Sequence, residues 1–109
     1  MLFLFLICHD ATFDPPSSLG PETVAWVQDL ERRGARRAGG RLRLADEATV
    51  VRVRDGEPVL RSGSRTADAE QIAGFDLLEF DSLADAVEAA TGHPMATHGT
   101  IEVRPLWPD

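Results

Sequence analysis

Two histidines and a carboxylate stand where acid–base chemistry could take place. His98 and Gly99 come directly before an alternating, strand-like segment, and His9 and Asp10 follow the first apolar run. An imidazole titrates near neutral pH, so His98 is the candidate general acid or base. Asp10 could orient that imidazole or raise its pKa. The sequence therefore predicts His98 and Asp10 as catalytic residues.

Simpler interpretations of the same residues stay open. His98 could cap a loop by binding a carbonyl, and Asp10 could be a turn residue. His9 could be a solvated residue at a strand end. His93 precedes Pro94 at a helix end, where a cationic ring would favour the helix dipole. We interpret His93 as structural.

No metal or cofactor is expected. Four side chains could in principle hold a metal ion: His9, Asp10, Glu70 and His98. Their spacing matches no ligand motif such as His-x-x-x-His, and the chain has no P-loop, nucleophile elbow or dinucleotide motif. All 11 basic residues are arginines, which excludes Schiff-base chemistry on a lysine. Cys8 is expected to be a buried, unreactive strand residue.

The apolar pattern predicts two β-α-β units with a hairpin inserted between them. Leu2–Cys8 is a continuous apolar run, as in a central strand that is buried on both faces. The helix that Ser82 begins has an apolar stripe of Leu83, Ala86, Val87 and Ala90. The other expected elements are a helix over Pro21–Gly34, strands over Arg36–Leu44, Gly74–Phe80 and Thr100–Leu106, and a hairpin of Thr49–Arg54 with Pro58–Arg61 around the turn Asp55-Gly56.

This order predicts an α+β fold of the ferredoxin-like, split βαβ type. The first and third core strands would be central and antiparallel, and the last strand would lie beside the first. Antiparallel pairing places the end of one strand beside the start of the next. We therefore expect His9, Asp10, Glu70 and His98 to meet at one edge of the sheet. On the last strand, Arg104 is expected to point off the core face without pairing with Glu102.

Length and charge limit the classes of function. The chain has 109 residues, which suggests a single domain over residues 1–109. A formal charge of -7 disfavours nucleic acid as a partner. The apolar run at the start is too short to span a bilayer and lacks a basic flank, so no membrane association is expected. A single cysteine fits a reducing, cytoplasmic location.

Several segments carry a resemblance to a known family. The tail from His98 to Pro105 is similar to a closing His-Gly-x-x-Glu-Val-Arg-Pro, Val51–Gly56 to a family hairpin, and Glu70–Phe75 to the entry of a core strand. In these segments the chain resembles the YCII-related family, in particular its branch named for an Asp-Gly-Pro-Phe motif. The resemblance implies a homodimer in which two sheets face each other as an α+β barrel. Some relatives act on small ring-cleavage products, with a histidine and an aspartate proposed as catalytic.

One loop departs from that family pattern. Ser62-Gly63-Ser64-Arg65 stands where the namesake motif would be, and only the glycine is shared. Gly63 and Gly99 would allow a ligand to approach the backbone closely. The expected ligand-binding residues are His9, Gly63, Ser64, Arg65 and Glu70.

Two functions follow as hypotheses. The first is a protein that binds a small anionic organic ligand and uses His98 and Asp10 in a lyase- or isomerase-type reaction. The alternative is a non-catalytic, dimeric binding or regulatory module with a degenerate site.

Overall fold

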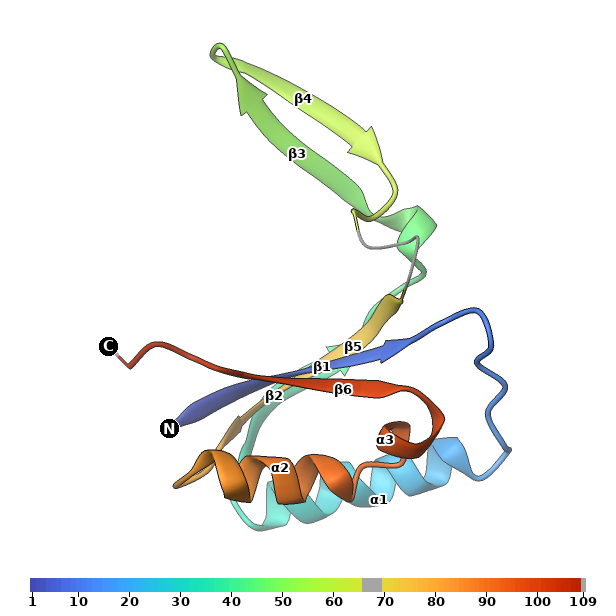
Figure 1. The fold of residues 1–109 in the computed structure, drawn as a ribbon, viewed down its shortest axis with the longest axis vertical. Coiled ribbons are helices and arrows are strands. Elements are labelled where there is room, and N and C mark those ends of the chain that lie inside the picture. Colours follow the sequence, from blue (N-terminus) through green and yellow to red (C-terminus); the bar gives the residue numbers. More distant parts are fainter. Residues whose placement is uncertain (66–69, 109) are drawn as a thin grey trace.

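A four-stranded antiparallel sheet forms the body of the molecule (Figure 1). The computed structural model describes residues 1–65 and 70–108. The strands run in the order β2-β5-β1-β6, with bounds β1 Leu2–His9, β2 Arg36–Arg41, β5 Gln71–Glu79 and β6 Thr100–Pro105. Each neighbouring pair is antiparallel. This is the strand order of the ferredoxin-like fold, and it confirms the predicted central positions of β1 and β5.

Two longer helices cover one face of this sheet (Figure 1). They are α1 (Leu19–Arg32) and α2 (Leu83–Thr91), and a short helix α3 (Met95–His98) leads into β6. Ser82 caps α2, because its hydroxyl accepts the backbone N–H of Asp85 at 3.1 Å. Trp26 Nε1 donates to the Ala89 carbonyl at 2.9 Å, which joins α1 to α2.

The core lies between the sheet and the helices. Alternation along β1 points Phe3, Phe5 and Ile7 toward the helices, and all three are buried. The predicted apolar stripe of α2 was partly wrong, since Leu83 and Val87 are 53% and 48% exposed. The residues of α2 that face the core are Ala86, Ala89 and Ala90. These small side chains let α2 pack closely against Trp26 and the sheet.

The opposite face of the sheet has no helix over it (Figure 1). Leu4 pairs with Leu77 and Leu6 with Phe75 across β1 and β5, and all four side chains are only half-buried. We call this surface the open face. The prediction that β1 is buried on both faces is therefore wrong for the single chain, because the helices cover only one of them.

An ion pair on β6 also lies on the open face. Arg104 Nη1 is 3.2 Å from Glu102 Oε2, and these residues pair with Leu4 and Leu6 of β1. The expectation that the two could not pair was wrong. Residues i and i+2 of a strand point to the same face, so the two side chains are neighbours.

The inserted hairpin extends away from the body on the side opposite the helices (Figure 1). It consists of β3 (Thr49–Arg54) and β4 (Glu57–Ser62), and a 3₁₀ turn η1 (Ala45–Glu47) precedes it. Asp55 and Gly56 have φ of 52° and 77°. Two successive positive φ values are typical of the type I′ turn that joins antiparallel strands, which confirms the predicted hairpin.

A buried ion pair connects β2 to β5. Arg36 Nε donates to Asp76 Oδ1 at 2.7 Å, and the two side chains are 15% and 7% exposed. Gly39 makes room for the pair, since a Cβ there would collide with both side chains. Burial raises the pKa of Asp76, and the hydrogen bond and charge of Arg36 oppose that rise.

Replacing Arg36 with methionine should destabilise the protein, because Asp76 would be left as a buried carboxylate without its partner. We expect a loss of about 3 kcal/mol in the free energy of unfolding at pH 7, measured by urea denaturation. The loss should shrink at acidic pH, because a raised carboxyl pKa favours folding most where the group is protonated.

Arg37→Met is the matched control for this substitution. Arg37 pairs with Glu79 at 3.2 Å on the surface, where both side chains are about half exposed. It should cost less than about 1 kcal/mol. Equal losses for the two variants would contradict the role given to the buried pair.

Candidate functional site

Strand pairing brings three separate segments to one edge of the sheet. His9 at the end of β1 pairs with Gln71 at the start of β5. Cys8 pairs with Thr100 at the start of β6. We call this edge the strand mouth and define it as residues 8–10, 70–72 and 98–100. The predicted meeting of these segments is confirmed in their backbone.

Glu70 is fixed at the strand mouth by a hydrogen bond across the sheet. Thr100 Oγ1 donates to Glu70 Oε1 at 3.0 Å. Cys8 lies between these segments, and burial raises the pKa of its thiol, with further contributions from the charges of Glu70 and Glu102. A thiol with a raised pKa is a poor nucleophile, which agrees with the expectation that Cys8 is unreactive.

Asp10 has the geometry of a turn residue. Its Oδ1 accepts the backbone N–H of Thr12 at 2.9 Å and the Thr12 hydroxyl at 2.5 Å. These two hydrogen bonds lower the pKa of Asp10, so the carboxylate stays ionised near neutral pH. Within the described residues no hydrogen bond or ion pair joins Asp10 to His98.

The two histidines of the strand mouth have different surroundings. The His9 ring stacks on Phe13 with centroids 4.4 Å apart, and its Nδ1 lies 3.4 Å from the Asp10 carbonyl oxygen. His98 is the last residue of α3 and is half-buried. In the described part of the chain its imidazole has no hydrogen-bond or ion-pair partner. Its ring nitrogens are therefore available to a ligand.

His98 was expected in a loop, but the structure places it in α3. His93 supports this helix, because its Nδ1 accepts the backbone N–H of Met95 at 2.9 Å and its ring packs on Trp26 at 4.5 Å. His93 is 3% exposed, and burial lowers its pKa to about 4. The expected structural role of His93 is therefore confirmed. The expected positive charge is wrong, because a ring with this pKa is neutral at pH 7.

Gly99 allows close packing between protein segments. A Cβ at this position would collide with the Cys8 carbonyl oxygen and lie 2.9 Å from Met95 Cε. The backbone that approaches Gly99 most closely is thus that of β1. This contact sets how near α3, and His98 with it, can lie to the end of β1.

The loop after β4 connects the hairpin to the strand mouth. The Gly63 and Ser64 N–H groups donate to the carbonyls of Ala48 and Ala45 at 2.8 and 3.0 Å. The Ala45 N–H in turn donates to Gln71 Oε1 at 3.4 Å, beside His9. Gly63 has φ of 91°, a conformation that favours glycine. Arg65 follows as an exposed side chain.

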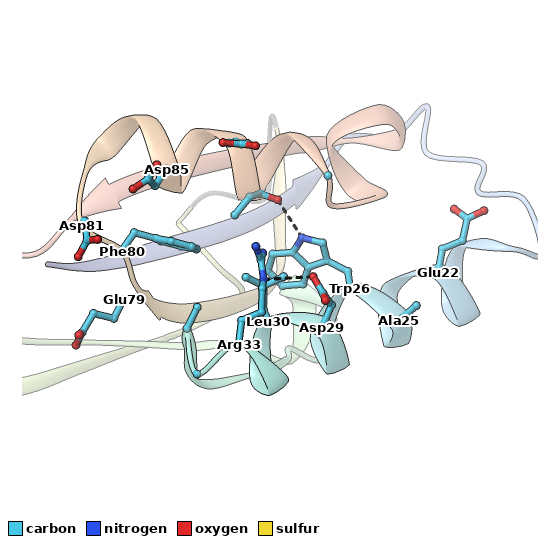
Figure 2. A pocket seen from close by; sticks show the side chains of 15 residues that line it. Glu22, Ala25, Trp26, Asp29, Leu30, Arg33, Glu79, Phe80, Asp81 and Asp85 are labelled. Atoms are coloured by element: carbon cyan, nitrogen blue, oxygen red, sulfur yellow. Dashed lines mark hydrogen bonds and ion pairs between the residues drawn. The ribbon is translucent and has the colours of Figure 1, made fainter.

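A concave surface lies between α1 and α2, away from the strand mouth (Figure 2). It encloses about 810 Å³ over Trp26 and Phe80. Its charged lining residues are Glu22, Asp29, Arg33, Glu79, Asp81, Asp85 and Glu88. We call it the acidic groove. Sequence reasoning missed it, because its carboxylates come from segments that only helix packing brings together.

Side chains of the types that bind metal ions do not cluster in the described structure. In residues 1–65 and 70–108, no three His, Cys, Asp or Glu side chains lie close enough to share a metal ion. No helix in the same residues is long and apolar enough to cross a membrane.

Comparison with known families covers nearly the whole chain. The model of the YCII-related domain matches residues 1–108. The chain belongs to the YCII-related family. A search of curated proteins finds no match to this YCII-related chain. Family membership thus identifies the kind of domain but not its chemistry.

Gly99→Ala should disturb the strand mouth of this YCII-related protein, because the new methyl group would push β1 away from α3. We expect a loss of about 1–3 kcal/mol in unfolding free energy, with NMR shifts at Cys8 and His98. Gly92→Ala is the control, since a Cβ there meets the Ala89 carbonyl at an ordinary 3.6 Å. An equal, small effect of both variants would contradict the packing role of Gly99.

His93 should make the protein less stable in acid. Its folded pKa of about 4 lies below the ordinary histidine value of 6.5, so the unfolded chain binds the proton first as pH falls. Unfolding free energy should decrease by roughly 3 kcal/mol between pH 6.5 and 4 from this group. Urea denaturation of the native chain and of His93→Gln isolates this contribution. Parallel pH curves for the two proteins would rule it out.

Proposed function

We propose that this YCII-related protein binds a small organic anion at the strand mouth and transfers a proton with His98. The observation that carries the proposal is the His98 imidazole, which has no hydrogen-bond or ion-pair partner among residues 1–65 and 70–108, at an edge where His9 and Glu70 also lie. A general acid or base must lie within hydrogen-bond reach of its substrate, directly or through one water, and a half-buried ring that has no partner in the described structure meets the first requirement for this role.

Other residues at the strand mouth and in the loop after β4 would bind the rest of the ligand. Arg65 supplies positive charge for a carboxylate, and the His9 ring can donate a hydrogen bond to it. Glu70, held by Thr100, can accept a hydrogen bond from a ligand hydroxyl. Asp10 acts in this proposal as a fixed negative charge beside His9, because its carboxylate is bonded to Thr12. The acidic groove is a poor site for the same ligand, since its carboxylates would repel an anion.

The proposed assembly is a homodimer. The open face carries leucine and phenylalanine side chains from β1 and β5 that no helix of the described residues covers, beside the Arg104–Glu102 ion pair of β6. Two sheets that pack face to face would bury these residues, as in the α+β barrel that the family resemblance implies. The lone, buried Cys8 suits the cytoplasm. We also assign the chain to the Asp-Gly-Pro-Phe branch, on the hairpin and the tail that resemble it.

A non-catalytic binding or regulatory module is the second candidate. It is favoured by the Thr12 hydrogen bonds that occupy Asp10, and by the altered loop Ser62–Arg65. In this case the strand mouth would bind the ligand without chemistry.

Deuterium incorporation distinguishes the two candidates. A panel of small 2-oxo and unsaturated carboxylic acids is incubated with the protein in D₂O and followed by proton NMR. We expect the native protein to exchange a carbon-bound proton of at least one acid, and His98→Gln to exchange it about 100-fold or more slowly. Glu88→Gln in the acidic groove is the control and should leave the rate unchanged.

Two outcomes would count against the catalytic proposal. Exchange by His98→Gln at the native rate would remove the role of His98. Binding of an acid without any exchange above the buffer rate would favour the non-catalytic module.

A further inference from the structure

The hairpin of β3 and β4 is a projecting arm that no other described part of its own chain covers. Its two strands pair only with each other in the described structure. Every residue of β3 and β4 is exposed except Val50, which is half-buried. A two-stranded hairpin alone in water is marginally stable. We call residues 49–62 the arm.

The arm has one apolar face. The cross-strand pairs Val51–Leu60 and Val53–Pro58 point to the same side, because successive residues of a strand alternate. Val51, Val53 and Leu60 are 62%, 60% and 66% exposed. Four apolar side chains at the end of a projecting element form a patch of the kind that marks a protein interface.

The opposite face of the arm is basic. It contains the pairs Val50–Arg61, Arg52–Val59 and Arg54–Glu57. The arm thus carries three arginines against two carboxylates, within a chain whose formal charge is -7. A basic arm is attracted to the acidic body of another copy of the same chain.

The position of the arm indicates where that copy lies. The arm extends from the end of the sheet to the side of the open face, away from the helices (Figure 1). A second sheet seated on the open face would therefore lie next to the arm. The same symmetry that places one arm beside the partner places the partner's arm beside the first copy.

Interface size also favours contact with the arm. Four strands about 4.8 Å apart and six residues long give the open face a footprint of about 400 Å². A standard interface buries about 800 Å² on each partner. One face of the arm, two strands wide and six residues long, adds roughly 200 Å². The arm therefore brings the contact between two copies closer to the size of a stable interface.

We propose that the arm of each copy packs its apolar face, with Val51, Val53, Pro58 and Leu60, against the second copy. The inference rests on the homodimer of the proposed function and adds a contact outside the two sheets. It also links assembly to the strand mouth. The Ser64 N–H, just after the arm, donates to the Ala45 carbonyl, and the Ala45 N–H donates to Gln71 in the strand mouth. Holding the arm in place would therefore also hold Gln71 and this part of the strand mouth.

Paired aspartate substitutions test this contact by sedimentation equilibrium. Val51→Asp alters the apolar face, and Val59→Asp makes the same change on the opposite face at a residue that is 49% exposed. We expect the dimer dissociation constant to rise at least about 30-fold for Val51→Asp and less than about threefold for Val59→Asp. Equal effects of the two, or none, would overturn the proposed contact while leaving a sheet-to-sheet dimer intact.

Hydrogen exchange provides a test that needs no variant. Arm amides of the native protein should be protected above the dimer dissociation constant and lose that protection on dilution. Fast exchange at both concentrations would overturn the proposal. A native protein that stays monomeric would overturn both the dimer and the arm contact. Ligand binding at the strand mouth is measured separately, by the deuterium experiment.

Discussion

The antiparallel pairing of β1 with both β5 and β6 is the constraint on which the rest of the structure depends. Its register sends Phe3, Phe5 and Ile7 into the core beneath the helices and Leu4 and Leu6 to the open face. The same register places the end of β1 beside the starts of both neighbours. A one-residue shift would exchange the two faces and dismantle the strand mouth as well as the core.

Burial separates the ionisable groups that support the fold from those available for chemistry. His93 and Asp76 are buried, have shifted pKa values and hold α3 and β2 in place. At the strand mouth Asp10 and Glu70 are exposed, and His9 and His98 are half-buried. Perturbed pKa values often mark functional sites, but here they mark structural contacts. The candidate site is defined by the strand ends that antiparallel pairing brings together.

Periodicity was sufficient to predict the order of the strands and the hairpin turn at Asp55-Gly56. It could not predict what covers an apolar face: the run Leu2–Cys8 has apolar residues on both sides, but helices cover only one. Short-range hydrogen bonds determine the surroundings of Asp10 and the helix that contains His98. Thr12 binds Asp10, and His93 nucleates the short helix that ends at His98. No spacing rule reveals either contact, so the proximity of segments was predictable and the partners of individual side chains were not.

The proposed function depends on ligand binding at the strand mouth of this YCII-related protein. Chemical-shift mapping of the ¹⁵N-labelled protein with a mixture of small organic acids tests this binding. The largest amide shifts are expected on residues 8–10, 70–72 and 98–100. Shifts that fall instead on the acidic groove around Trp26 and Asp85, or that spread evenly over the molecule, would contradict this proposal.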